Sequence, residues 1–225
     1  MNDGVVSDRA VSGTSGGLRT AFESGTIRSG RAWGALVGTL VVGLATDLAS
    51  KWAAFEWLAA APVRVSRAEV LEATRLRLGL GSLIPQPPPK VTIVPSVLDL
   101  TLVLNPGAVF GMGAGKRWFF IAFTFGALLL AGWMFAAWTR PRDRLAHVAI
   151  ALLVSGGLGN LYDRLVYGCV RDFLHPLPGL AFPSGVLGGR EVWPYVSNLA
   201  DLWLLVGIGL LMWFLWRGTP RGARG

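Results

Sequence analysis

Four long apolar segments limit what this chain can fold into. They run from Trp33 to about Trp57, from Trp118 to Trp138, from Leu145 to about Leu161, and from Leu199 to Trp216. Each approaches the roughly 20 residues that a helix needs to cross a hydrocarbon layer about 30 Å thick. A segment in lipid must satisfy its own backbone hydrogen bonds, which a helix does. The pattern therefore predicts an α-helical integral membrane protein with four transmembrane helices.

Tryptophan and arginine residues gather at the ends of these segments. Trp33, Trp57, Trp118, Trp138 and Trp216 mark segment ends, and indole rings favour the membrane interface. Arginine clusters that flank the same segments are typical of contact with phospholipid headgroups. In a soluble protein the net charge of +8 would favour nucleic acid, but 52% hydrophobic content indicates membrane lipids as partners and no nucleic acid.

The rest of the chain predicts one membrane domain with two tails. Residues 1–30 are rich in Ser, Gly and Arg and predict a disordered tail. Residues 31–217 then form the membrane domain, and residues 218–225 a second tail. Four crossings put both tails on one side of the membrane. Basic residues divide almost evenly between the two sides, but they are denser beside the short connections, which favours cytoplasmic tails.

The two longer connections, on the other side, differ in character. Residues at about 62–90 predict an insertion with a short amphipathic stretch and a proline-rich spacer. The β-branched residues from 91 to 104 predict strands, so we expect a small extracytoplasmic β-region. The second connection, about 174–197, is rich in Pro and Gly and predicts a loop, either a lid over a membrane-level site or a plain connector.

Polar residues from four stretches of chain fall at one membrane depth, near the outer face. Ionisable groups near hydrocarbon are costly unless they are paired, hydrated or functional, so they form a candidate site by default. The residues are Asp47, Asn105, Asn160, Asp163, Arg164, Asp172, Asn198 and Asp201.

Two pairs in this set also have structural interpretations. Asn198 could cap the fourth helix, with Asp201 in its first turn facing the helix dipole. Asp163 and Arg164 are better explained as an ion pair than as catalytic groups, because the arginine would hold the carboxylate ionised.

Asp47 and the glycines of the third span have structural interpretations as well. Asp47 would hydrogen-bond inside the bundle or neutralise Lys51, one helical turn later. The run SGGLGN, residues 155–160, predicts close helix packing through small residues. As a phosphate-binding loop it lacks a lysine and a preceding strand.

The chemistry open to such a site is limited. His147 lies near the opposite face, His175 is followed by Pro, and Cys169 has no neighbouring histidine, so Ser/His and Cys/His nucleophiles are poorly supported. The absence of a Cys/His cluster predicts no metal and no cofactor. Two carboxylates that share a proton remain. One would take a proton from an attacking water while the other polarises a carbonyl, as in aspartic proteases.

Four motifs in chain order resemble those of the lipoprotein signal peptidases, or signal peptidase II. They are TDLASK at 46–51, NPGAVFG at 105–111, GGLGNLYDRLVYGCVRDF at 156–173, and SNLADLW at 197–203. Together with the spans, the resemblance covers about two thirds of the chain. Each motif alone is weak, but the ordered combination is specific.

The resemblance implies a membrane aspartic endopeptidase whose catalytic pair is Asp172 and Asp201. It thereby selects Asp172 over Asp163, which spacing alone leaves open. The residues that match site-organising positions of the family are Asp47, Asn105, Gly107, Asn160, Asp163, Arg164 and Asn198.

The implied substrate is a diacylglyceryl-modified prolipoprotein, cleaved just before its lipidated cysteine. The resemblance also implies a multi-pass protein of the bacterial cytoplasmic (inner) membrane. Its termini would be cytoplasmic, and its active site would lie at the outer face.

Some positions depart from the family pattern. Leu48 stands where a polar residue is usual, Val109 replaces an alanine, and Ser197 precedes Asn198 where an aromatic residue is common. The link from Asp172 to Asp201 is about ten residues longer than expected, and the insertion at about 62–90 is unusual. These departures bear on substrate preference and on loop behaviour.

Two other functions fit the same residues. A proton-coupled transporter or channel also uses membrane carboxylates, although here they cluster at one face rather than forming a chain across the bilayer. A relative that binds lipopeptides without cutting them would keep both carboxylates.

Overall fold

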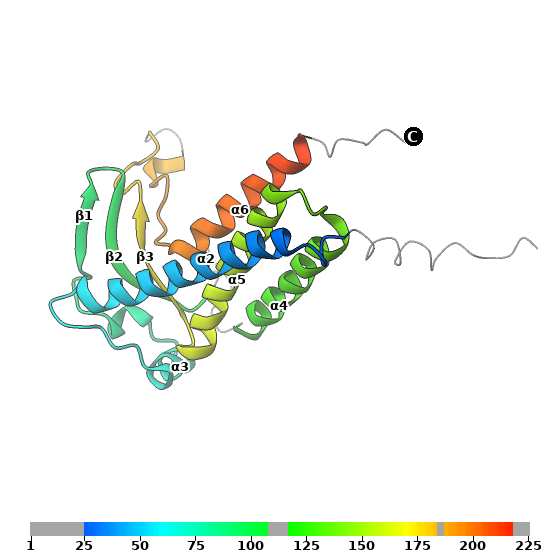
Figure 1. Cartoon of the computed structure of the whole chain (residues 1–225). Coiled ribbons are helices and arrows are strands. Elements are labelled where there is room, and N and C mark those ends of the chain that lie inside the picture. Colours follow the sequence, from blue (N-terminus) through cyan, green and yellow to red (C-terminus); the bar gives the residue numbers. More distant parts are fainter. Residues whose placement is uncertain (1–24, 108–116, 184–186, 218–225) are drawn as a thin grey trace, which may run out of the picture.

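The computed structural model describes residues 25–107, 117–183 and 187–217. Most of the first predicted tail and all of the second lie outside these ranges, as does Val109. Within the described residues, four apolar helices are long enough to cross a membrane, which confirms the predicted spans (Figure 1). The spans are α2 (Gly30–Trp57), α4 (Arg117–Trp133) with its π-helical continuation η3 (Met134–Trp138), α5 (Arg144–Val166) and α6 (Leu199–Trp216).

Helix α5 is the central helix of the bundle and packs against α2, α4 and α6. Half of its most apolar stretch is buried in the protein, against 17% or less in the other spans. The helix continues to Val166, five residues beyond the predicted end at Leu161. The added turn carries Asp163, whose charge is compensated by buried partners, so polarity there does not end the helix.

Small residues set the close approach of the helices. A Cβ atom on Gly156 would meet the carbonyl oxygen of Ala200 in α6, and one on Gly207 would lie 3.0 Å from the carbonyl oxygen of Ala149 in α5. The carbonyl of Gly43 in α2 accepts a hydrogen bond of 3.1 Å from the Trp203 indole of α6. The prediction that the SGGLGN run serves helix packing is confirmed.

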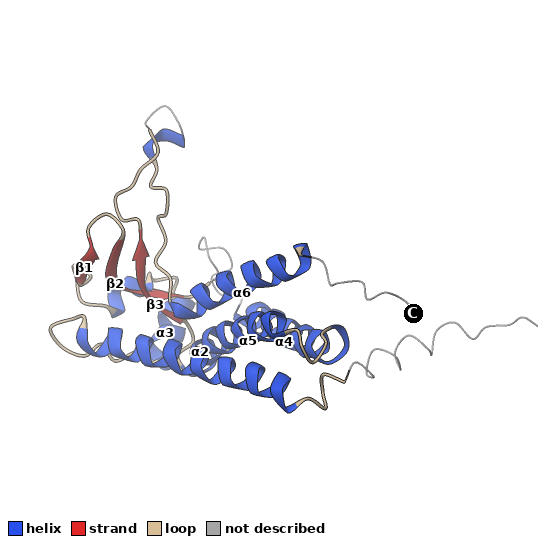
Figure 2. Cartoon of the chain, turned by 45° about the horizontal axis from the view of Figure 1, so that its top comes forward, coloured by secondary structure: helices blue, strands red, loops and turns tan. Residues whose placement is uncertain are grey.

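A three-stranded antiparallel sheet lies at one end of the bundle, opposite the end where the described chain begins and finishes (Figures 1 and 2). Its order is β1 (Lys90–Val94), β2 (Leu98–Asn105) and β3 (Val170–Pro176). The first two confirm the strands predicted at 91–104. The third follows directly after α5 and was not predicted. We call this end of the bundle the sheet end.

The predicted insertion folds against the sheet end. It contains the short helix α3 (Arg67–Arg75), which confirms the amphipathic stretch, and the 3-10 turn η1 (Leu80–Leu83). Four apolar side chains attach it to a core beneath the sheet: Val70, Ala73, Leu80 and Ile84.

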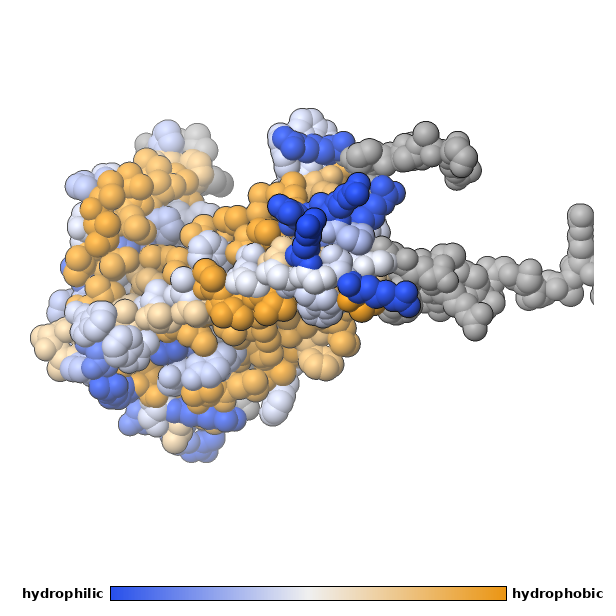
Figure 3. Space-filling view, viewed as in Figure 1, coloured by the Kyte–Doolittle hydropathy of each residue, from blue (hydrophilic) through white to orange (hydrophobic). Residues whose placement is uncertain are grey.

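The second connection is mainly a loop, as predicted. It contains the short turn η4 (Leu187–Gly189), and two isolated bridges, Leu174–Ser197 and Ala181–Glu191, hold its limbs together. Figure 3 shows a hydrophobic surface over the helices with hydrophilic groups towards the two ends of the bundle, as expected of a membrane-spanning protein.

Candidate active site

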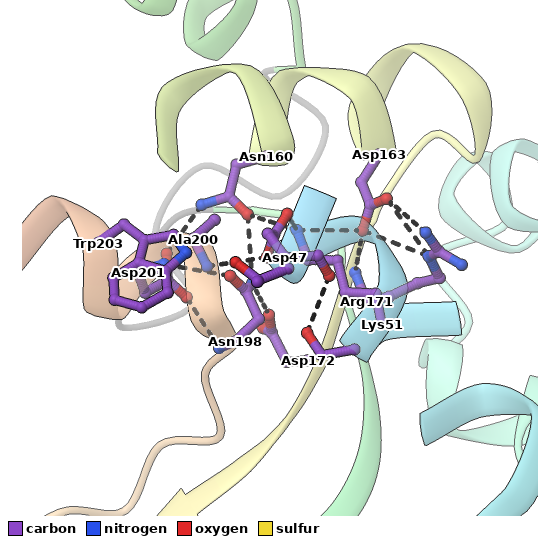
Figure 4. A network of polar contacts seen from close by, with 12 residues as sticks. Asp47, Lys51, Asn160, Asp163, Arg171, Asp172, Asn198, Ala200, Asp201 and Trp203 are labelled. Atoms are coloured by element: carbon purple, nitrogen blue, oxygen red, sulfur yellow. Dashed lines mark hydrogen bonds and ion pairs between the residues drawn. The ribbon is translucent and has the colours of Figure 1, made fainter. Parts of the chain in front are cut away.

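The predicted polar residues meet at the sheet end, where α2, α5, β3 and α6 converge (Figure 4). The predicted convergence at one depth is therefore confirmed. Seven of them are joined, with Lys51 as the link to Asp47 and Asp163, in one network of hydrogen bonds and ion pairs: Asp47, Asn105, Asn160, Asp163, Asp172, Asn198 and Asp201. Gly107 and Arg164 lie at its edge.

Asp201 is fixed by the start of α6. The Asn198 side-chain oxygen accepts a hydrogen bond of 3.1 Å from the backbone N–H of Asp201, and the Asp201 Oδ2 accepts one of 3.2 Å from the backbone N–H of Asn198. This reciprocal capping box confirms Asn198 as the N-cap. The cap also holds the Asp201 carboxylate in one orientation.

Two asparagine amides connect Asp201 with Asp172. Asn198 Nδ2 donates to Asp172 Oδ1 at 2.6 Å and to Asn160 Oδ1 at 3.2 Å. Asn160 Nδ2 in turn donates to Asp201 Oδ1 at 2.8 Å. Neither amide carries a net charge, so the links position both carboxylates without forcing both to be ionised.

Asp172 lies on β3 in an almost closed environment, with 1% of its surface exposed. Asn105 Nδ2 donates to its second oxygen at 3.1 Å. Burial, and then repulsion from Asp201, raises the pKa of Asp172 to about 7, while the bonds from Asn198 and Asn105 oppose this rise. Asp172 is therefore able to hold a proton near neutral pH.

A buried lysine balances the acids behind this pair. Lys51 Nζ lies 2.8 Å from Asp47 Oδ2 and 3.6 Å from Asp163 Oδ2, and it donates to Asn160 Oδ1 at 3.2 Å. The predicted neutralisation of Asp47 by Lys51 is confirmed. The other oxygen of Asp47 accepts from the backbone N–H of Ala200 at 2.8 Å, so Asp47 also supports the first turn of α6.

The predicted ion pair between Asp163 and Arg164 is wrong. Successive helical residues point about 100° apart, and Asp163 turns inward to Arg171, whose Nη2 lies 2.9 Å from Asp163 Oδ1. The backbone N–H of Arg171 also donates to Asp163 Oδ2 at 2.9 Å. Arg171 and Lys51 were not among the predicted site residues. The sequence did offer a signal for both: Arg171 is next to Asp172 in one motif, and Lys51 is a charged residue in the same motif as Asp47.

Arg164 instead secures the chain after β2. It donates to the carbonyl oxygens of Asn160 at 3.1 Å and Gly107 at 3.2 Å. The backbone N–H of Gly107 donates to Asn105 Oδ1 at 3.0 Å. Because Asn105 also contacts Asp172, these bonds connect the end of α5 with the proposed pair.

Gly159 provides a test of how tightly the network is packed. A Cβ atom at this position would overlap Asp47 Oδ2 and lie 3.4 Å from the Ala200 side chain. We expect Gly159→Ala to lower the free energy of unfolding by about 1–3 kcal/mol through overpacking. Thermal unfolding in detergent measures the change.

Gly157→Ala is the matched control, because its Cβ would lie at an ordinary 3.6 Å from the Thr124 methyl group. This variant should keep wild-type stability or gain a little from helix propensity. Equal unfolding temperatures for the two variants would contradict the packing argument.

The two histidines take no part in the network. His147 is buried in α5, 3.1 Å from Thr139 Oγ1, near the end of the bundle opposite the sheet. His175 on β3 lies opposite Asp99 on β2 in the register of the sheet. Among the residues that the structure describes, no group of three His, Cys, Asp or Glu residues could hold a metal ion.

These features define an integral membrane protein with two carboxylates joined by amides at one end of a four-helix bundle. Residues 39–217 match the family model described as signal peptidase (SPase) II. The chain therefore belongs to the signal peptidase II family, which confirms the resemblance seen in its motifs.

Individual relatives agree with this assignment. A lipoprotein signal peptidase of Desulfitobacterium hafniense is 39% identical over 123 residues, which are 54% of this chain and 71% of that protein. One of Moorella thermoacetica is 35% identical over 142 residues, covering 62% and 81%. A bacterial membrane enzyme solved by the in meso method matches with a TM-score of 0.58 and 23% identity, covering 85% of this chain and 93% of that one. The structural match supports the fold.

Proposed function

We propose that this protein is a membrane aspartic endopeptidase that removes the signal peptide from diacylglyceryl-modified prolipoproteins, cleaving before the lipidated cysteine. The observation that carries the proposal is the pair Asp172 and Asp201, joined through Asn198 and Asn160 in a chain of the signal peptidase II family. Relatives that are 39% and 35% identical to matched stretches of this chain are named lipoprotein signal peptidases.

In the proposed reaction Asp201 acts as the base and Asp172 as the acid. Asp201 takes a proton from a water molecule while the water oxygen attacks the scissile carbonyl, and Asp172 gives its proton to the carbonyl oxygen. When the tetrahedral intermediate collapses, the C–N bond breaks and Asp201 passes its proton to the leaving nitrogen. Asp172 recovers a proton from the hydroxyl group. The pair thus returns to its starting state and needs no cofactor or metal.

The position of the pair suits a substrate held in the same bilayer. Both carboxylates lie where spanning helices end, so a lipid-anchored cysteine can reach them by lateral diffusion. Acyl chains supply binding free energy of about 0.8 kcal/mol per buried methylene. Membrane lipids are therefore partners as well as solvent.

We further propose that residues 31–217 act as one domain in the bacterial cytoplasmic membrane, with cytoplasmic tails and the sheet end at the outer face. The dense arginines beside the short link between α4 and α5 favour this orientation. A signal peptidase that works on exported proteins also requires its site on that side.

A cleavage assay tests the proposed function directly. Purified wild-type protein in detergent is incubated with a diacylglyceryl-modified prolipoprotein, and the products are separated on a gel. Cleavage immediately before the lipidated cysteine is the expected result, and an unmodified precursor serves as the control. A folded wild-type protein that leaves the modified substrate intact would favour the binding or transport functions instead.

The raised pKa of Asp172 predicts a specific pH dependence. Asp172 must be protonated to act as the acid, so kcat/KM should fall as pH rises through about 7. The Asn105 hydrogen bond stabilises the ionised form, and Asn105→Ala should therefore move this fall to higher pH. Rates measured from pH 5 to 9 check both statements. A rate that stays constant above pH 7 would exclude Asp172 as the acid.

A further inference from the structure

Helix α3 has a buried apolar face, an exposed edge with basic and apolar side chains, and an exposed acidic edge. Val70 and Ala73 point into the protein and are buried. At about 100° per residue, Arg67, Leu71 and Arg75 fall within about 80° of one another on one exposed edge. Glu69 and Glu72 fall on the other edge.

The helix lies at the level where the α5 span ends. Gly168 is two residues beyond the end of α5. A Cβ atom added to Gly168 would lie 3.4 Å from the side chain of Val70 and 3.5 Å from that of Leu71, so α3 packs directly against this point. Figure 1 likewise shows α3 beside the end of α5, next to the bundle. Since Val166 ends a membrane span, α3 is at the depth of the lipid headgroups.

The exposed side chains of this segment combine apolar and basic groups. Leu71, Leu76 and Leu78 are 40%, 52% and 57% exposed. Arg75 pairs with Glu72, whereas within the described parts of the chain no ion pair is found for Arg67 or Arg77. Arg77 has a left-handed backbone (φ 57°), so it reverses the chain between the two exposed leucines that flank it. Hydrophilic groups also mark this part of the surface in Figure 3.

We propose that residues 67–78, which we call the α3 anchor, lie in the membrane interface and bind anionic phospholipid headgroups. The leucines would enter the boundary between headgroups and acyl chains, while Arg67 and Arg77 bind lipid phosphates and Glu69 and Glu72 face water. The same bilayer already surrounds the four-helix bundle, so no separate partner is required. The anchor would fix the sheet over the site at a constant depth, and it does not depend on the proposed peptidase activity.

Site-resolved fluorescence quenching tests this arrangement. Cys169 is buried, and burial raises the pKa of its thiol to about 12, so a new cysteine is labelled selectively near neutral pH. A bimane fluorophore is attached at Leu71→Cys and, as the matched control on the opposite edge, at Glu69→Cys. The full-length protein is placed in nanodiscs that contain phosphatidylcholine or phosphatidylglycerol with a nitroxide near the headgroup.

We expect nitroxide lipids to quench the label at position 71 strongly and the label at position 69 weakly, with more quenching by phosphatidylglycerol. Arg67→Glu combined with Arg77→Glu should remove the preference for phosphatidylglycerol, since each basic residue near a membrane surface contributes about fivefold in affinity. A label at Leu78→Cys provides a second position outside the helix. Equal quenching at 71 and 69, or quenching at 71 and 78 that does not differ between the two lipids, would overturn the proposal.

Discussion

Asp201→Asn should lower the rate of prolipoprotein cleavage by roughly 10²- to 10⁴-fold or more, because an amide cannot take a proton from the attacking water. The asparagine can still accept the hydrogen bond from the backbone N–H of Asn198, so the start of α6 should remain intact. Asp172→Asn should have an equally large effect, since it removes the proposed acid. The measurement is single-turnover cleavage of the lipid-modified precursor.

A control for this experiment is an acid outside the network. Asp99 on β2 is buried and pairs with Lys90 at 2.7 Å, and Lys90 holds the pKa of Asp99 below its usual value. Asp99→Asn should therefore affect the stability of the sheet more than it affects turnover. Turnover retained by Asp201→Asn or Asp172→Asn would contradict the proposed mechanism.

Lys51→Met should produce the second large effect, a loss of stability. Lys51→Met keeps the length of the side chain but leaves Asp47 and Asp163 without their shared cation, in a place that water does not reach. Breaking a buried ion pair from one side costs about 3–5 kcal/mol. For a chain of this size that corresponds to a fall of roughly 10 °C in Tm. Thermal unfolding in detergent, followed by tryptophan fluorescence, measures it.

Arg64→Met is the surface counterpart of this substitution. Arg64 pairs with Glu56 at 3.2 Å, but its side chain is 75% exposed, so its loss should cost less than about 1 kcal/mol. Adding Asp47→Asn to Lys51→Met should recover part of the lost stability, since Asp47 loses its lysine partner in Lys51→Met, whereas Asp163 keeps its ion pair with Arg171. A Tm for Lys51→Met equal to that of Arg64→Met would show that the buried network contributes little.

Hydropathy was sufficient to predict the membrane spans, because lipid imposes both a length and a composition on them. The ends of Leu199–Trp216 agree with the prediction, whereas α5 continues past its predicted end. Polar residues end a transmembrane helix where they would face lipid, but not where they pair with groups inside the protein. In α5 the cations that pair with Asp163 come from β3 and α2, which no local pattern reveals.

Sequence spacing left open whether Asp163 or Asp172 belongs to the acidic pair, and their surroundings show how they differ. Asp163 is held by two cations, Arg171 and Lys51. Within the described part of the chain, the hydrogen bonds that Asp172 receives from side chains come from the amides of Asn198 and Asn105. This difference supports the choice of Asp172, but it depends on contacts between residues far apart in the chain. Sequence periodicity does not contain that information.

The Asp47–Lys51 pair also bears on how the chain enters the membrane during synthesis. Both charges lie on α2, one helical turn apart, so the first span can leave the translocation machinery as an electrically neutral helix. Asp163 and Arg171, by contrast, lie on two different elements, and their charges are matched only after β3 folds back beside α5. The first span can therefore reside in the bilayer before the other helices are inserted. The third span needs charged residues of other elements to compensate Asp163.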